Sequence, residues 1–152
     1  MNCKHRHLKI YEAGKMSGLT KNQMLAWRIE LKDALANAAW DKSYTVQVIN
    51  PVEFYDCEYA DENRQSEFEA EDFDLHHVKT SDLIVVNLDG LATSDGSKIE
   101  LHDANYNNRI PVIAFGDKDL YDSLHPWVKR NITRVEKDIE GVVKYITDFY
   151  MI

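Results

Sequence analysis

Five short apolar runs, separated by longer segments with helical periodicity, constrain the fold of this chain most. The run Leu83-Ile84-Val85-Val86-Asn87-Leu88 is typical of a buried strand. Further strands are expected at 8–13, 44–49, 110–115 and 132–135. Strands joined through helices need crossover connections, so the pattern predicts a mainly parallel five-stranded sheet with helices on both faces. The expected fold class is α/β, a three-layer sandwich of flavodoxin-like or Rossmann-like type.

The segments between the expected strands carry apolar residues at helical spacing. Thr20 and Gln23 fit a capping box at the start of the first helix, whose core-facing stripe is formed by Met24, Trp27, Leu31 and Leu35. Other helices are expected over about 66–80, from Glu100 to about 107, and over 139–149. Segment 52–65 is polar and is interpreted as a loop, either over a site or simply solvated. Segment 117–130 is expected to be a loop that can include a short helical turn.

Composition favours one domain spanning residues 1–152 and limits the classes of partner. The two cysteines, Cys3 and Cys57, are too few for a disulfide framework, which predicts a reducing, cytoplasmic setting. No apolar run is long enough to span a bilayer, so no membrane partner is expected. The net charge of −8 argues against binding a nucleic-acid polymer, because such binding relies on clustered Lys and Arg. Any nucleic-acid chemistry would therefore concern small molecules.

The first candidate site is the loop Gly14-Lys15-Met16-Ser17-Gly18-Leu19-Thr20, between a strand and a helix N-terminus. Backbone N–H groups at such a position suit an anion or sugar hydroxyls. The loop is not a Walker motif and lacks the glycine spacing of dinucleotide-binding loops. A simple tight turn explains its glycines equally well.

Two acidic residues are further candidates. Glu100 follows a buried strand in Asp95-Gly96-Ser97-Lys98-Ile99-Glu100, where ligands of open α/β sheets bind. Ser97 through Glu100 also matches the capping-box pattern, so Glu100 is interpreted either as a helix cap or as a catalytic carboxylate. Asp74 taken alone indicates a solvated helix face. His76 and His77 are adjacent, which disfavours a zinc pair, and no metal or cofactor is expected.

Short motifs follow one another in order along nearly the whole chain. They are Tyr11 with Ala13-Gly14-x-Met16-Ser17-Gly18-Leu19, Val48-Ile49-Asn50-Pro51, Asp74-Leu75, Ser81 through Asp89, Gly96-Ser97-x-x-Glu100, Pro111 through Gly116, and His125-Pro126-Trp127. Together they resemble the nucleoside 2-deoxyribosyltransferase family in its bacterial and phage-type members, which is related to the 2′-deoxynucleoside 5′-monophosphate N-hydrolases.

The resemblance implies a role for each matching residue. Glu100 stands where the family has the nucleophile that attacks the anomeric carbon, Asp74 where it has the acid that assists protonation of the base, and Tyr11 where a tyrosine orients the nucleophile. A covalent deoxyribosyl-Glu100 intermediate and retention of configuration would follow. Candidate substrate-binding positions are Gly14, Lys15, Met16, Ser17, Asp89, Ser94, Asp95, Gly96, Ser97 and Asn131.

The resemblance also implies a homodimer or higher homo-oligomer, in which Asn131 would complete the site of a neighbouring subunit. Two departures bear on the substrate. Lys15 replaces a proline found in many members, and Ser94 replaces the aspartate that classical transferases use for a sugar hydroxyl. Lys15, Ser17 and Ser94 could accept a 5′-monophosphate, or the adjacent Asp95 could take the role of that aspartate.

Three functions stay open at this point. The first is transfer of 2-deoxyribose from a 2′-deoxynucleoside to a free nucleobase, without a cofactor. The second is hydrolysis of deoxynucleosides or their 5′-monophosphates. The third is a non-catalytic nucleotide-binding module.

Overall fold

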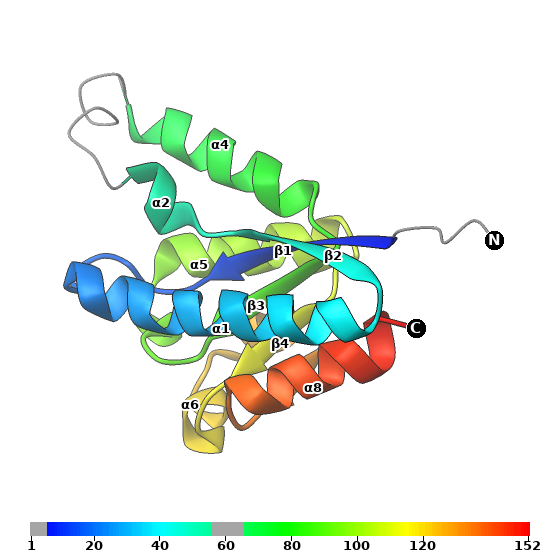
Figure 1. Cartoon of the computed structure of the whole chain (residues 1–152). Helices are drawn as coiled ribbons and strands as arrows, with labels where there is room; N and C mark the ends of the chain where they lie inside the picture. Colours follow the sequence, from blue (N-terminus) through cyan, green and yellow to red (C-terminus); the bar gives the residue numbers. More distant parts are fainter. Residues whose placement is uncertain (1–5, 56–65) are drawn as a thin grey trace.

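Five parallel strands form the central sheet of the computed structural model, which describes residues 6–55 and 66–152 (Figure 1). The strands lie in the order β2-β1-β3-β4-β5. Tyr11 of β1 is in register with Ile49 of β2 and with Ile84 of β3. The predicted parallel sheet is confirmed. The strands are β1 (Arg6–Ala13), β2 (Tyr44–Ile49), β3 (Leu83–Asn87), β4 (Val112–Phe115) and β5 (Arg134–Glu136).

Helices cover both faces of the sheet, which confirms the three-layer arrangement (Figure 1). On one face, α1 (Lys21–Asp41) and α8 (Ile139–Tyr150) bury a cluster that includes Ile10, Leu31, Leu35, Val142 and Ile146. On the other face lie α4 (Glu67–Lys79), α5 (Asp95–Leu101) and the π-helix η2 (His102–Asn107), over a cluster that includes Tyr11, Ala13, Val78, Leu101 and Ala104. None of the helices in the described ranges is both long and apolar enough to cross a membrane.

Successive side chains of β1 point to opposite faces of the sheet. Ile10 packs in the cluster under α1 and α8, whereas Tyr11 and Ala13 pack in the cluster under α4 and α5. This alternation places Glu12 on the α1 side. The neighbours Tyr11 and Glu12 are therefore both buried, with their side chains on opposite faces of the sheet.

The predicted start of α1 is confirmed by both bonds of its capping box. Thr20 Oγ1 accepts from the Gln23 backbone N–H at 3.2 Å, and Gln23 Oε1 accepts from the Thr20 backbone N–H at 2.9 Å. The buried stripe of α1 differs from the predicted one, because Met24 and Trp27 are half-buried while a charged residue, Arg28, is completely buried.

Two predicted loops contain helices. The first residues of segment 52–65 belong to α2 (Pro51–Tyr55), where Asn50 Oδ1 accepts from the Val52 backbone N–H at 3.0 Å. Proline is well suited to the first turn of a helix, since its missing N–H has no partner there. Residues 56–65 lie outside the described ranges. Segment 117–130 holds two short helices, α6 (Lys118–Asp122) and α7 (Pro126–Lys129), so it is more helical than the predicted loop with a short helical turn.

The expected capping box at Ser97–Glu100 is also wrong. Helix α5 begins at Asp95, and its N-cap is Ser94, three residues before Ser97 and directly after the 3₁₀-helix η1 (Leu91–Thr93). Ser97 is thus inside the first turn, and its hydroxyl lies 2.8 Å from that of Ser94. Glu100 falls in the second turn and has no capping role, whereas the helical extent to Asn107 is confirmed by α5 and η2.

Candidate active site

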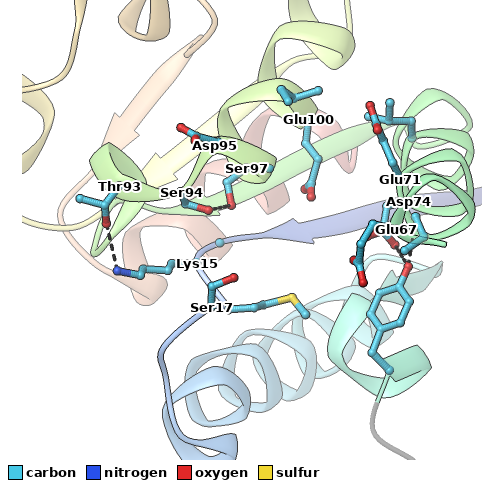
Figure 2. Close-up of a pocket in the computed structure, with 17 residues that line it drawn as sticks. Lys15, Ser17, Glu67, Glu71, Asp74, Thr93, Ser94, Asp95, Ser97 and Glu100 are labelled. Carbon is cyan, nitrogen blue, oxygen red and sulfur yellow. Dashed lines mark hydrogen bonds between the residues drawn. The ribbon is translucent and has the colours of Figure 1, made fainter. Parts of the chain in front are cut away.

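A cavity of about 560 Å³ opens beyond the carboxyl ends of β1 and β3. Its walls come from the segment after β1, the end of α2, one face of α4, and the segment from Thr93 into α5 (Figure 2). The strand order reverses between β1 and β3, because β1 connects outward to β2 while β3 connects to β4 on the other side. Such a switch point is where open α/β sheets bind their ligands.

Most of the predicted site residues line this cavity. Glu100 and Asp74 do so from different helices, together with Gly14, Lys15, Met16, Ser17, Ser94, Asp95, Gly96 and Ser97. Three predicted residues do not line it. Tyr11 is fully buried in β1, Asp89 is exposed in the turn after β3, and Asn131 is 4% exposed and donates to the Trp127 carbonyl of its own chain at 3.1 Å.

Glu100 points from α5 into the cavity (Figure 2). The residue is partly exposed, but its carboxylate atom Oε2 is shut off from solvent and has no hydrogen-bond partner in the described part of the chain. Burial, with a smaller effect from the charge of Asp74, raises the pKa of Glu100 to about 8. Arg28 and the Tyr11 hydroxyl act in the opposite direction and lower this pKa.

Tyr11 lies behind Glu100 as a neutral donor. Burial first, and then the charges of Glu100 and Asp74, raise the pKa of the Tyr11 hydroxyl far above its ordinary value. The hydroxyl is close enough to lower the pKa of Glu100, yet it misses hydrogen-bond geometry, and within residues 6–55 and 66–152 it has no partner. A buried donor and a buried acceptor therefore sit side by side, each able to take part in a further interaction.

Asp74 faces the cavity from α4, opposite the helix that carries Glu100 (Figure 2). Its Oδ1 accepts a hydrogen bond of 2.9 Å from the Tyr55 hydroxyl of α2. Burial raises the pKa of Asp74 to about 6, while the bond from Tyr55 lowers it. With pKa values of about 6 for Asp74 and about 8 for Glu100, the two acids together carry one proton around neutral pH.

Cationic and hydroxyl groups gather at the other end of the cavity. Lys15 Nζ donates to Thr93 Oγ1 at 3.0 Å and so joins the segment after β1 to the segment after β3 (Figure 2). Lys15 runs across Gly90, whose φ is +78° and at which an added Cβ would lie 2.7 Å from Lys15 Cδ. A glycine is thus needed at position 90 both for the turn and for the lysine. Ser17, Ser94 and Ser97 add hydroxyl groups to this end.

Several lining residues were missed from the sequence. Tyr55, Glu67, Glu71 and Thr93 all border the cavity. Glu67, Glu71 and Asp74 share one face of α4 because they recur at helical spacing, a signal that was present in the sequence. Asn50-Pro51 was a signal for the helix that carries Tyr55, since Asn is a preferred N-cap and Pro a preferred first residue. Within the described ranges, no group of three or more His, Cys, Asp or Glu side chains could hold a metal ion.

Comparison with known proteins adds support for the fold. No protein-family model matches the chain, and no curated protein matches it. The crystal structure of a conserved protein from Enterococcus faecalis V583 is similar, with a TM-score of 0.67 and 20% identity over 93% of this chain and 98% of that one. A 2-deoxyribosyltransferase from Bacillus psychrosaccharolyticus has 22% identity over 90% of this chain and 91% of that one, at a TM-score of 0.49, which is too low to support an inference.

Proposed function

We propose that this chain is a nucleoside 2-deoxyribosyltransferase. The observation that carries the proposal is the pair of carboxylates, Glu100 and Asp74, which reach one cavity from two different helices at the switch point of the sheet. The motifs on which the sequence resemblance rests are spread over the chain, yet residues of three of them border this cavity, among them Ser17, Asp74, Ser97 and Glu100. A random set of structural acids would have no reason to converge in this way.

The proposed chemistry needs the two carboxyl groups in different protonation states, with Glu100 ionised and Asp74 protonated. Ionised Glu100 attacks C1′ of the deoxyribosyl group, so a bond from C1′ to a Glu100 oxygen forms as the bond from C1′ to the base nitrogen breaks. Asp74 gives its proton to the leaving base. In the second step a new base attacks C1′ on the same face, loses its proton to Asp74 and releases Glu100. Two displacements retain the configuration at C1′.

The remaining residues have supporting roles in this scheme. The Tyr11 hydroxyl, which is buried beside Glu100, orients the nucleophile as a donor. Tyr55 fixes the Asp74 carboxyl through its 2.9 Å bond. Residues of the segment after β1 and of the start of α5 hold the sugar.

A second candidate is hydrolysis of 2′-deoxynucleoside 5′-monophosphates. The observation that favours it is the cluster of Lys15, Thr93, Ser94 and Ser97 at the end of the cavity away from Asp74, where a cation and hydroxyl groups suit a phosphate. Water then replaces the acceptor base in the second step.

One experiment separates these functions. Deoxynucleosides and their monophosphates are incubated with the protein, each with and without a second free base, and the products are resolved by chromatography. Transfer gives the new nucleoside, whereas hydrolysis gives free deoxyribose or its 5-phosphate. Mass spectrometry after rapid quenching should show the glycosylated protein, and Glu100→Gln should abolish both turnover and this adduct. A wild-type protein that releases no base from any of these substrates contradicts both proposals and favours a binding module.

A further inference from the structure

Arg28 of α1 is a completely buried cation on the far side of the sheet from α5. Its Nη1 donates to the Met24 carbonyl at 2.6 Å, its Nη2 donates to the Gly14 carbonyl at 3.2 Å, and its guanidinium lies 4.4 Å from the centre of the Trp27 ring. Its Nε has no hydrogen-bond partner in the described part of the chain. A buried charge is costly, so this one calls for an explanation beyond the packing of α1.

Gly14 is the point at which Arg28 comes close to the cavity. Gly14 follows the last residue of β1 and lines the cavity, so no strand intervenes between α1 and the cavity there. An added Cβ on Gly14 would lie 2.8 Å from Trp27 Cζ2 and 3.3 Å from Arg28 Nη2. Arg28 therefore sits directly behind a wall that consists of backbone alone.

Arg28 acts first on a carboxyl of its own face, because its charge lowers the pKa of Glu12. Glu12 is fully buried on the α1 side, but neither of its oxygens has a hydrogen-bond partner in the described ranges. Burial raises the pKa of Glu12 to about 9, which keeps this side chain protonated near neutral pH. The second carboxyl whose pKa Arg28 lowers is Glu100, which also faces Tyr11 of β1 and Asp74 of α4.

When only one of the two acids is protonated, the proton must lie on Asp74 for attack to occur. Burial works against this, because it raises the pKa of Glu100 to about 8 but that of Asp74 to about 6. A nearby cation favours the ionised form of Glu100 and increases the fraction of molecules in the reactive arrangement.

We propose that Arg28 is a positioning residue with two effects. Its hydrogen bond holds the Gly14 carbonyl in the cavity wall, and its buried positive charge favours ionisation of Glu100 over ionisation of Asp74. The catalytic consequence rests on the proposed function. Neither effect requires Arg28 to touch the substrate.

Two substitutions separate the wall from the charge. Arg28→Gln removes the charge but keeps a donor for the Gly14 carbonyl, whereas Arg28→Lys keeps a charge. Lys32→Met is the matched control, since Lys32 lies one turn further along α1, is half exposed and pairs with Glu53 at 3.8 Å. The first readout is the pH dependence of kcat/KM, which reports the ionisations of the free enzyme.

For Arg28→Gln, the maximum of kcat/KM should fall about tenfold and the basic limb should move upward by about one pH unit, because loss of an opposite charge raises the pKa of Glu100. Arg28→Lys and Lys32→Met should keep the wild-type limbs. A lower maximum with both limbs unmoved in Arg28→Gln would mean that Arg28 serves the wall alone and would overturn the proposal. If Arg28→Gln does not fold, Arg28→Lys decides, because displaced limbs in a variant that keeps the charge contradict the proposal.

A second readout does not depend on turnover. In a ¹³C NMR titration of the glutamate carboxyl carbons, the Glu100 signal is assigned by its loss in Glu100→Gln. The pKa of Glu100 should be higher in Arg28→Gln than in the wild type by about one pH unit. An unchanged pKa refutes the charge effect, whatever the reaction is, while a raised pKa in a protein without turnover refutes the proposed function alone.

Discussion

The Tyr55 hydroxyl donates a 2.9 Å hydrogen bond to Oδ1 of Asp74 and so joins α2 to α4 at the edge of the cavity. This bond lowers the pKa of Asp74, while burial raises it. Tyr55 thereby influences how readily the proposed acid gives up its proton. It also limits the orientations that the Asp74 side chain can adopt.

Tyr55→Phe removes this bond and should raise the pKa of Asp74 above its present value of about 6. The acidic limb of kcat/KM should then move to higher pH by about half a pH unit, because one hydrogen bond to a charged group is lost. Tyr44→Phe is the control, because the Tyr44 hydroxyl donates a hydrogen bond to the Ile152 carbonyl and neither residue lines the cavity. An acidic limb that stays in place in Tyr55→Phe would show that this bond does not set the ionisation.

The wild-type protein should have a bell-shaped dependence of kcat/KM on pH, with limbs near the pKa values of about 6 for Asp74 and about 8 for Glu100. Below the lower value both acids are protonated and the nucleophile is lost. Above the upper value both are ionised and the donor for the leaving base is lost. Steady-state rates measured over about six pH units, from about pH 4 to about pH 10, give this profile. A rate that keeps rising through the upper limb would contradict the role of a protonated acid.

Lys15→Met tests whether the cavity accepts a phosphate. Removing the ammonium group should raise KM for a 5′-monophosphate about tenfold more than KM for the matching nucleoside, which corresponds to the loss of one charge-assisted hydrogen bond. Steady-state kinetics on the two substrates give the comparison. Lys42→Met, at the exposed C-terminal end of α1, is the control for loss of a positive charge. Equal changes in KM for both substrates would show that Lys15 does not bind the phosphate.

Gly14→Ala should destabilise the fold by about 1–3 kcal/mol, because the new methyl group would overlap the rigid edge of the Trp27 ring. Gly96→Ala is the matched variant from the same cavity, since an added Cβ at Gly96 meets no atom within 4 Å. It should leave stability unchanged or raise it by about 0.5–1 kcal/mol, as Ala favours a helix. Urea denaturation followed by circular dichroism measures both. Equal stabilities of the two variants would contradict the tight packing behind Gly14.

The sheet was predictable because each strand is a short apolar run, and because most segments between the strands carry apolar residues at helical spacing. The catalytic candidates were harder, since local pattern alone explains Asp74 as a solvated residue and Glu100 as a cap. Ser94 and Ser97 are both acceptable N-caps by residue type, so the sequence could not indicate which one begins α5. Arg28 was missed because an arginine within a helix is expected to be exposed, and its burial depends on the carbonyl of Gly14, which lies outside the local pattern of α1.

Because α5 starts at Asp95, its formation does not require the side chain of Glu100. Since Glu100 lies beyond the first turn, the helix does not depend on its carboxylate, and the chain carries a desolvated acid whose Oε2 contributes no hydrogen bond to folding within the described residues. In the proposed function such a group serves the reaction and not the stability of the native state. The residue type at position 100 therefore affects the chemistry of the cavity more than the formation of α5. The chemistry could change in evolution while the surrounding fold stays the same.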